Sequence, residues 1–570
     1  MAPKKKFRLR EEWKNNKGNI KWIFAQGKGF RKYIVGFLVI SFVSMIITLA
    51  SSVAGKFVVD AATGYQSDSF YKYILIMLGT TAVTILLSYF SAVFSGYVGE
   101  KFAFRIRAEM FDKVQRSRWF DISRFHSADM LSRLTGDVNN LATAIISIVP
   151  TAIVAFVELV IVAVILIYFD PVMALIGFVI GPLGVIAGAL YRRKYVKYRK
   201  ELRESESEYY AFFQETLINL PVTKAFQMED SNVSLFEKIR KNRLTLVMNS
   251  SRLGALMSVL MRIVYNLGYV VAFSWCAYRL SDPTTGYTYG TMTLFLSLVS
   301  VLQGTIRSLG SIFPQMMSTI VSAKRLREIT EVPSEEYADK TDIPKAVGLE
   351  IENVSFAYET ENVLKSVSIK VNPSERVGIV GSSGAGKTTF IRLLLSLVEP
   401  QDGEAFYIAD GEKEKISPAS RRFISYVPQG NTLMSGTIRS NLLTADISAT
   451  DEQMWKALEI ACADKFVRKC AKGLDTPLSE KAGGLSEGQA QRIAIARAIL
   501  RDRPVLIFDE ATSALDEDTE AKIFERLSAE TDKTCFIITH RRSMLRYCDS
   551  VFELDGEGGA EHKLLCKDKN

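Results

Sequence analysis

Cysteine is scarce in this sequence, with six residues among 570. No two of them form a C-x-x-C pair, and their spacing matches no metal site. This argues against a disulfide framework and predicts reduced thiols in a cytosolic compartment. The cysteines are Cys276, Cys462, Cys470, Cys535, Cys548 and Cys566.

Excess positive charge is absent from most of the chain, although the whole sequence carries +9. Residues 1–32 hold eleven Lys or Arg and two acids, so the rest of the chain is neutral overall. This argues against nucleic-acid binding, which needs a basic patch on a folded face. A basic segment just before an apolar stretch instead fits attraction to anionic lipid and retention in the cytoplasm.

The basic N-terminal segment lacks the features of a targeting peptide. It is too long for the basic region of a signal peptide, and no small-residue cleavage site follows the first apolar stretch. Glu11 and Glu12 argue against a mitochondrial transit peptide. Around Ile20, Ile23 and Phe24 the apolar residues recur at helical spacing, which predicts an elbow helix on the membrane surface. A disordered basic tail is the alternative.

Long apolar runs are missing beyond about Asp339, but several precede it. A membrane span needs about 20 mostly apolar residues. The stretch 33–322 contains six such runs, which predicts an all-α transmembrane domain. The predicted spans are residues 33–57, 73–96, 143–168, 171–191, 256–278 and 289–321.

Basic residues are concentrated in two loops between the predicted spans, 97–142 and 192–255. By the positive-inside rule, we expect both loops and both termini to be cytoplasmic. Apolar residues recur at helical spacing in these loops, with few Gly or Pro breaks. We therefore expect the spanning helices to continue as long cytoplasmic extensions; separate soluble insertions are the alternative.

From Leu349 the pattern changes to short β-rich runs that later alternate with helical segments. This predicts an α/β domain with a largely parallel sheet over residues 349–570. Residues 323–348 are expected to form a linker between this domain and the spans.

A glycine-rich loop follows one of the predicted strands and precedes a helix. The sequence GSSGAGKTT fits the pattern G-x-x-x-x-G-K-[ST] of P-loop ATPases. Its glycines let backbone N–H groups wrap phosphates at a helix N-terminus. Lys387 would reach the terminal phosphates of ATP, and the Thr388 hydroxyl would bind Mg²⁺. The predicted loop comprises Gly381, Ser382, Ser383, Gly384, Ala385, Gly386, Lys387, Thr388 and Thr389.

Two adjacent acids end a predicted buried strand in the sequence PVLIFDEATSALD. A carboxylate at Asp509 can hold Mg²⁺, and Glu510 can orient and activate an attacking water. A solvated surface pair is the alternative, but four apolar residues directly before the acids argue against it.

Three further features accompany these motifs. AGGLSEGQAQRIAIARAIL occupies residues 482–500, Gln429 follows SYVP, and His540 follows CFIIT. In order and spacing, the set resembles the ATP-binding cassette (ABC) family. The six-span region resembles the transmembrane domain of its exporter branch (type IV, B-family-like), so the chain would be a half-transporter.

Two stretches of the cytoplasmic loops strengthen this resemblance. SADMLSRLTGDV at 127–138 and ETLINLPVTKAF at 215–226 are similar to sequences around the coupling helices of that branch. The resemblance implies coupling helices near 118–130 and 209–222.

The resemblance also implies roles for single residues. Tyr358 would stack on the adenine, Gln429 would contact Mg²⁺, and His540 would contact the γ-phosphate. His540 alone could be a core histidine, but its strand-end position after the acidic pair favours the functional role. The expected metal ligands are Thr388, Gln429 and Asp509, and the expected catalytic residues are Glu510 and His540.

A signature loop would complete the ATP site of a partner subunit through Ser486, Gly488 and Gln489. Asp516 would lie at the interface between the two nucleotide domains. The usual sequence is L-S-G-G-Q, but here Glu487 replaces the first glycine. Because an inward carboxylate would repel the γ-phosphate, we expect Glu487 to face outward; a weakened site is the alternative.

The implied function is ATP-driven export from the cytoplasm or inner leaflet, by alternating access in a dimer. A homodimer is favoured because one chain holds all the hydrolytic residues, with a heterodimer as the alternative. The expected location is a bacterial plasma membrane. The spans argue against a non-transporting chromosome or repair ATPase, and the fused domains against an importer. An ATP-gated channel or regulator without pumping is the remaining alternative function.

The substrate is left open between a drug, a lipid and a peptide, although no cysteine peptidase domain precedes the spans. Polar residues within spans are costly and usually face a bundle interior or a watery cavity. Arg262 and Arg307 lie at similar predicted depths and would make a cationic ring that favours an anionic substrate. In the alternatives, an arginine pairs with Glu158 or both arginines lie in cytoplasmic extensions. The polar residues in the spans are Glu158, Arg262, Asn266, Gln303 and Arg307.

Overall fold

The structure is a computed structural model. It describes residues 17–65, 70–282, 284, 286–336, 342–358, 361–479, 484–530 and 532–565, without the side chains of 180–193, 313, 361, 530 and 542. The start of the basic N-terminal segment and Cys566 lie outside these residues. The chain divides into two units: Met1–Lys113 with His126–Glu331, and Val114–Phe125 with Val332–Asn570.

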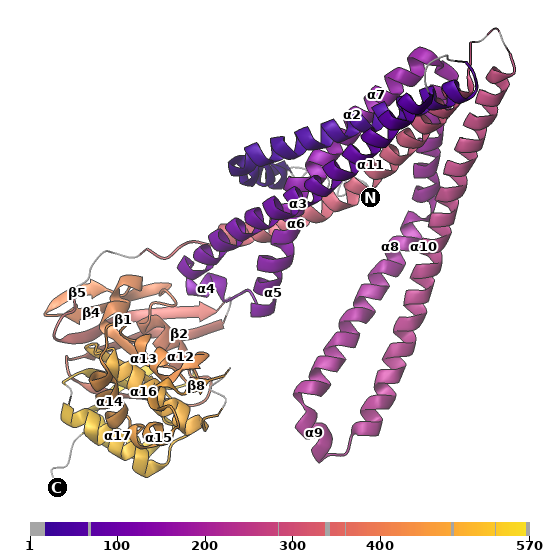
Figure 1. Ribbon diagram of the computed structural model, residues 1–570. Helices are drawn as coiled ribbons and strands as arrows, with labels where there is room; N and C mark the ends of the chain where they lie inside the picture. The colour runs from indigo at the N-terminus through magenta and orange to yellow at the C-terminus, as the bar shows by residue number, and fades with distance from the viewer. Residues whose placement is uncertain are drawn as a thin grey trace. The chain divides into compact units, whose positions relative to one another are not determined.

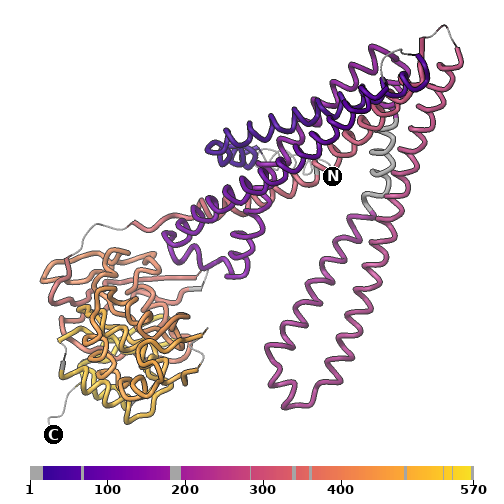
Figure 2. Tube along the Cα trace, viewed as in Figure 1, coloured from indigo at the N-terminus to yellow at the C-terminus, as the bar shows by residue number. Residues whose placement is uncertain are grey.

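All the regular secondary structure among the described residues of the first unit is helical. In Figures 1 and 2, α8 and α10 run side by side away from the other helices, and the short α9 joins them. The long helices are α2 (Arg31–Ala62), α3 (Phe70–Arg116), α7 (Val149–Phe169), α8 (Pro171–Ile218), α10 (Glu229–Leu280) and α11 (Tyr289–Thr330). The short ones are residues 17–26, η1 (Gly27–Phe30), α5 (Ser127–Ser132), η2 (Arg133–Asp137), α6 (Val138–Thr143), η3 (Ala144–Ile148) and α9 (Leu220–Ala225).

Five helical stretches of the described chain are long and apolar enough to cross a membrane. Each contains one predicted span and continues beyond it, which confirms an all-helical membrane domain with long helical extensions. The fourth predicted span lies in α8, where the side chains of 180–193 are outside the described residues, so it stays a prediction. The five stretches are Lys17–Ala62, Phe70–Arg116, Ser127–Phe169, Glu229–Leu280 and Tyr289–Thr330.

Two element boundaries differ from the sequence prediction. Helix α11 continues to Thr330, so the first residues of the expected linker are helical. The short helix between α8 and α10 is α9, which overlaps the end of the range 209–222 expected for a coupling helix, because α8 continues to Ile218. Pro221 within α9 explains the break, since proline suits the first turn of a helix and not its interior.

Two buried carboxylates join helices at one end of this unit. Oδ1 of Asp60, in α2, accepts a hydrogen bond from the backbone N–H of Gly290 at 2.9 Å, at the start of α11. Oδ1 of Asp170 caps α8 by accepting from Val172 N at 3.0 Å, and its Oδ2 accepts from Trp275 Nε1 at 2.9 Å. Both carboxylates therefore hold helix starts in register with neighbouring helices.

The second unit contains two main β-sheets. The strands are β1 (Val347–Tyr358), β2 (Glu361–Val371), β3 (Arg376–Gly381), β4 (Asp402–Ala409), β5 (Glu412–Lys415), β6 (Ile424–Val427), β9 (Val505–Asp509), β10 (Thr534–Ile538), β11 (Ser550–Leu554) and β12 (Ala560–Leu564). One sheet is antiparallel in the order β2-β1-β4-β5. The other has the order β12-β11-β3-β10-β9-β6 and is parallel except for β12. A third, two-stranded sheet pairs β7 (Gly436–Thr437) with β8 (Pro477–Leu478).

Helices complete two apolar cores in this unit. One core joins the antiparallel sheet to β3 and α12 (Lys387–Leu394) and includes Phe390 and Phe552. The other packs a group of helices against β6 and β9. Its helices are α13 (Ile438–Leu443), α14 (Asp451–Ile460), α15 (Asp464–Lys469), α16 (Glu487–Leu500) and α17 (Glu517–Glu530). The predicted α/β domain is confirmed, with a second, antiparallel sheet added to the parallel one.

Candidate nucleotide site

The phosphate loop lies between β3 and α12. Gly381, Gly384 and Gly386 have φ of 154°, 86° and 95°, a region that side chains rarely adopt. A Cβ on Gly386 would stand 3.1 Å from the backbone oxygen of Val363, so that position also lacks room for a side chain. The loop ends at the N-terminus of α12, where backbone N–H groups and the helix dipole favour an anion.

Lys387 is the first residue of α12, and its side chain turns back into the loop. Its Nζ donates to the backbone oxygens of Gly381 at 2.7 Å and Ser382 at 2.9 Å. The residue is 7% exposed, so its charge is held inside the loop. Thr388, by contrast, is exposed beside it. The Lys387 ammonium and the Thr388 hydroxyl therefore both lie at the phosphate loop.

The acidic pair ends β9, whose five residues are all buried. Asp509 is 5% exposed and accepts a hydrogen bond from Tyr426 Oη at 3.1 Å. Burial raises the pKa of the Asp509 carboxyl, and the hydrogen bond from Tyr426 opposes this shift. Glu510 has φ of 48°, a left-handed conformation that is strained for a non-glycine residue and is common at functional sites.

Three predicted site residues meet at the Glu510 carboxylate. Nε2 of Gln429 donates to Oε2 at 2.6 Å, and Nε2 of His540 lies 3.0 Å from Oε1. The His540 side chain is 55% exposed, so it is not a core histidine. Gln429 follows β6, Glu510 follows β9, and His540 follows β10.

The order of strands in the parallel sheet explains why Gln429, Glu510 and His540 come together. Its order β3-β10-β9-β6 places the carboxyl ends of four neighbouring strands at one edge. The phosphate loop follows β3, so Lys387 belongs to the same edge as Gln429, Glu510 and His540. Ligands of open parallel sheets bind outside this edge. The arrangement can hold a phosphate chain beside a carboxylate base.

The expected metal ligands offer only oxygen donors. They are the Thr388 hydroxyl, the Asp509 carboxylate and the amide oxygen of Gln429, whose nitrogen bonds Glu510. No group of three or more His, Cys, Asp or Glu in the described part of the chain could hold a metal alone. A small set of oxygen donors fits Mg²⁺, which takes most of its ligands from water and phosphates.

Tyr358, expected to stack on adenine, ends β1 inside an aromatic cluster. Its ring centroid lies 6.0 Å from that of Phe120 and 4.9 Å from that of Phe356, and its Oη accepts from Arg392 Nη1 at 2.8 Å. Phe120 belongs to α4 (Trp119–Ile122), which the second unit includes. This contact was not predicted from the sequence, although two adjacent aromatics within a charged loop, Trp119 and Phe120, are a signal for it.

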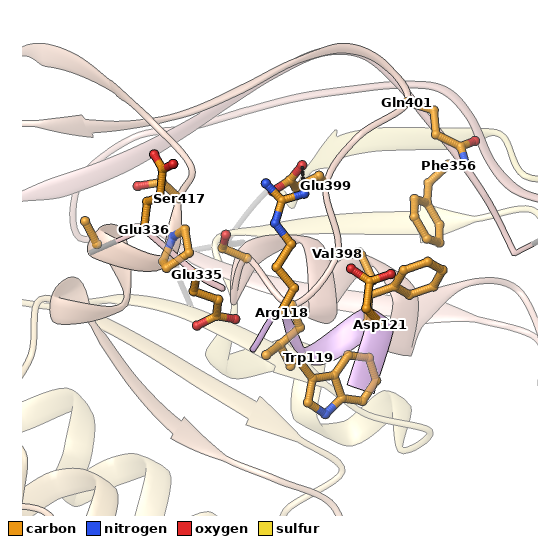
Figure 3. Close-up of a pocket in the computed structure, with 15 residues that line it drawn as sticks. Arg118, Trp119, Asp121, Glu335, Glu336, Phe356, Val398, Glu399, Gln401 and Ser417 are labelled. Atoms are coloured by element: carbon orange, nitrogen blue, oxygen red, sulfur yellow. Dashed lines mark hydrogen bonds and ion pairs between the residues drawn. The ribbon is translucent and has the colours of Figure 1, made fainter. Parts of the chain in front are cut away.

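A cavity of 560 Å³ lies beside this cluster (Figure 3). Arg118, Trp119 and Asp121 of the α4 segment face Phe356 and Glu399 there. Arg118 Nη1 is 3.4 Å from Glu399 Oε2, and the Arg392 guanidinium lies 5.0 Å from the Trp119 ring centroid. No phosphate-loop residue lines this cavity, so it is a joint between α4 and the nucleotide domain.

The signature residues lie at the start of α16. Ser486 Oγ accepts from Gln489 N at 3.3 Å, and Gln489 Oε1 accepts from Ser486 N at 2.9 Å, which forms a capping box. Glu487 is exposed. A Cβ on Gly488 would stand 2.8 Å from the backbone oxygen of Ala514, so glycine is required there.

Asp516 caps α17 by accepting from Thr519 N at 2.9 Å, and this hydrogen bond lowers the pKa of its carboxyl. Within the described residues, no hydrogen bond or ion pair joins Asp516 or the signature residues to the phosphate loop of the same chain.

In the first unit, the hydrogen-bond partner of Glu158 is a threonine and not the arginine considered as an alternative. Glu158 Oε2 accepts from Thr305 Oγ1 at 2.7 Å, and among the described residues Glu158 forms no ion pair with an arginine. The guanidinium of Arg307 instead lies 5.7 Å from the ring centroid of Tyr265. Arg262 and Asn266 are exposed on the same helix as Tyr265.

Known proteins resemble the chain over nearly its whole length. Residues 33–306 match the family model of the ABC transporter transmembrane region, and residues 364–513 match that of the ABC transporter domain. A putative multidrug export ATP-binding/permease protein of Bacillus subtilis is 28% identical over 93% of both chains. An ATP-dependent lipid A-core flippase of Desulfotalea psychrophila is 29% identical over 93% of this chain and 94% of its own. The solved structure of a bacterial Atm1-family ABC exporter with ATP bound has a TM-score of 0.78 at 23% identity, covering 94% of this chain and 95% of that one.

Proposed function

Because this chain belongs to the ABC transporter family and fuses its transmembrane region to its ATPase domain, we propose that it is a homodimeric exporter working by alternating access. The chain is a multi-pass membrane protein whose ATPase activity is coupled to transport. Under this proposal both termini face the cytoplasm of a bacterial cell. We assign residues 33–322 to the membrane domain, 323–348 to the linker and 349–570 to the nucleotide domain.

The Glu510 carboxylate, held between Gln429 and His540, carries the proposal. Hydrogen bonds of 2.6 Å and 3.0 Å orient it at the sheet edge from which the phosphate loop also emerges. There it would orient the attacking water and accept its proton. Lys387 would leave its loop carbonyls to hold the β- and γ-phosphates, His540 would contact the γ-phosphate, and Tyr358 would stack on the adenine.

Magnesium would be held by Thr388, Gln429 and Asp509. When bound, it would neutralise charge on the transferring phosphate. The hydrogen bond from Tyr426 would restrict the orientation of the buried Asp509 carboxylate.

A second copy of the chain would complete each ATP site. Within the described residues, no hydrogen bond or ion pair joins Ser486, Gly488 or Gln489 to the phosphate loop of their own chain, which suits a role on a partner's ATP. Asp516 would lie at the same interface. Since every proposed hydrolytic residue is present here, two copies of one chain suffice.

The tip of the α8–α10 hairpin supports a dimer as well. Leu220, Val222 and Phe226 on and beside α9 are 45%, 48% and 74% exposed. An apolar cluster at the end of a long hairpin calls for a partner surface. We propose that α9 docks on the partner's nucleotide domain, while α4 docks on its own, so that closure of the ATP sites moves both helices.

The substrate is proposed to be a drug, a lipid or a peptide. The relatives' names point to multidrug and lipid A-core substrates for those proteins. Arg262 and Arg307, neither of which is ion-paired within the described residues, would line the cavity and favour a carboxylate or phosphate on the substrate.

Glu510→Gln tests the hydrolytic site in full-length protein reconstituted into lipid. The amide keeps the shape but cannot accept a proton, so kcat should fall by about 10²–10⁴-fold while ATP binding persists. Glu517→Gln, an exposed carboxylate at the start of α17, is the matched control and should retain full turnover. Near-normal turnover by Glu510→Gln would remove this residue from its proposed role.

A further inference from the structure

An apolar crevice of 510 Å³ separates the N-terminal helical segment from α7. On one side lie residues 17–26, η1 and the start of α2, drawn in indigo in Figure 1. On the other lie η3 and α7. Ile23, Gly27 and Ile145 are buried at its floor, and a Cβ on Gly27 would stand 3.3 Å from Ile145 Cγ2. The two sides therefore pack closely at Gly27 and Ile145.

The rim of the crevice is basic. Lys21, Phe24, Lys28 and Arg31 follow one another at spacings of three, four and three residues, which places them on one stripe of a helical segment. All four are exposed, Phe24 by 58%. The residues that line the crevice include these three bases and no acid. In the described part of the chain, no ion pair joins any of the three bases to a carboxylate.

The position of the crevice in the chain indicates which class of ligand could occupy it. It lies at the start of the first helical stretch that is long and apolar enough to cross a membrane. A basic and apolar segment at such a position suits the boundary between lipid headgroups and acyl chains. The helix of residues 17–26 presents Ile20 and Phe24 outward, which are 37% and 58% exposed. A ligand here would meet apolar walls below and three cations above.

We propose that this crevice holds one resident anionic phospholipid, with an acyl chain against Ile23, Ile145 and Ile153 and its phosphate at Lys21, Lys28 and Arg31. A zwitterionic lipid carries a cation that would face the same three bases without a compensating carboxylate. Basic pockets between membrane helices on the cytoplasmic side suit anionic headgroups. The inference needs only the membrane location of the chain, and neither the direction of transport nor its substrate.

Neighbouring residues supply a matched pair of variants for the test. Arg31 lines the crevice, whereas Lys32 is also exposed but does not line it. Arg31→Gln and Lys32→Gln therefore remove the same charge from adjacent positions. Ile153→Trp fills the crevice without altering charge, and Arg31→Lys restores the charge.

Full-length protein is incubated with equal amounts of phosphatidylglycerol and phosphatidylcholine of identical acyl chains, and native mass spectrometry measures the ratio of bound lipids. We expect the wild type to prefer phosphatidylglycerol. Arg31→Gln should lower this preference by about fivefold, as expected for one basic residue at a membrane surface. Lys32→Gln and Arg31→Lys should retain it, and Ile153→Trp should lose the bound lipid.

Three results would overturn the proposal. An equal loss in Arg31→Gln and Lys32→Gln would show diffuse attraction to the whole basic segment. Unchanged lipid retention in Ile153→Trp would show that the crevice is not the acyl site. Displacement of the lipid by soluble glycerol phosphate would show a headgroup site alone.

Discussion

Gln429 and Glu510 are 81 residues apart in sequence, yet Nε2 of Gln429 donates to Oε2 of Glu510 across 2.6 Å. This bond ties the loop after β6 to the base at the end of β9. A change in the position of Gln429 would therefore be felt directly at the proposed catalytic carboxylate.

Gln429→Ala tests this link. Loss of the hydrogen bond leaves Glu510 less well oriented, so kcat should fall by roughly 10–100-fold, the usual effect of losing a supporting contact. ATP affinity should change less, because Lys387 and the loop backbone remain. Steady-state ATPase and direct nucleotide binding separate the two effects. Gln453→Ala, at the cap of α14, serves as control; an ATPase loss as large in that variant would point to a general defect.

Glu487→Gly restores the common signature sequence. Glu487 is exposed in the first turn of α16, where a carboxylate is favourable to the helix by about 0.3–1 kcal/mol. In the dimer its charge would oppose the γ-phosphate if it turned inward. We expect Glu487→Gly to preserve or raise ATPase activity, and Glu487→Gln to behave alike. A large loss in both variants would show that the carboxylate makes a necessary contact.

Arg421 connects the linker to the phosphate-loop helix. Its guanidinium donates to both Glu335 oxygens, at 2.6 and 2.9 Å, and to the backbone oxygens of Leu395 at 2.7 Å and Ser396 at 2.8 Å. The Glu335 side chain is only 6% exposed. The backbone N–H of Glu335 also donates to Arg116 O at 2.7 Å, so the linker holds the end of α3 as well.

Arg421→Ala should destabilise the nucleotide domain by about 3–5 kcal/mol, because a buried carboxylate loses both hydrogen bonds from the Arg421 guanidinium. Thermal unfolding of the full-length protein provides the measurement. Arg118→Ala breaks the exposed pair with Glu399 and should cost at most about 1 kcal/mol. Adding Glu335→Gln to Arg421→Ala should recover part of the loss. Equal effects of the Arg421 and Arg118 variants would contradict the buried-pair interpretation.

Arg262→Ala and Arg307→Ala test the proposed cavity. Both should impair stimulation of ATPase by an anionic substrate more than they impair basal ATPase, since neither contacts the nucleotide site. Arg252 is an exposed arginine on α10, the helix that carries Arg262. Arg252→Ala should leave stimulation of ATPase intact. If both cavity variants keep full stimulation, or both only unfold, the arginines do not bind the substrate.

The sequence signals for the candidate nucleotide site are local. A strand followed by a glycine loop, an acidic pair or a histidine places each residue at a strand end, and a parallel sheet gathers those ends at one edge. The meeting of Gln429, Glu510 and His540 follows from this topology without knowledge of distant contacts.

Contacts between distant segments could not be predicted in the same way. Asp60 and Asp170 counted only as charges of short loops, yet each is buried and holds a helix start. The pairing of Glu335 with Arg421 and the packing of Phe120 on Tyr358 depend on how α4 and the linker meet the nucleotide domain. A single sequence contains no periodic pattern that indicates which distant residues come into contact.

Alternating access is tested most directly by distances between two copies of the chain. Spin labels at Tyr65→Cys, just after α2, and at Lys238→Cys, on the part of α10 proposed to be cytoplasmic, are exposed reporters of the two sides, introduced after replacement of the native cysteines. In Glu510→Gln protein reconstituted into lipid, ATP and Mg²⁺ should lengthen the distance between the Tyr65→Cys labels and shorten that between the Lys238→Cys labels. Approach of the Lys238→Cys labels without any change at Tyr65→Cys would contradict alternating access.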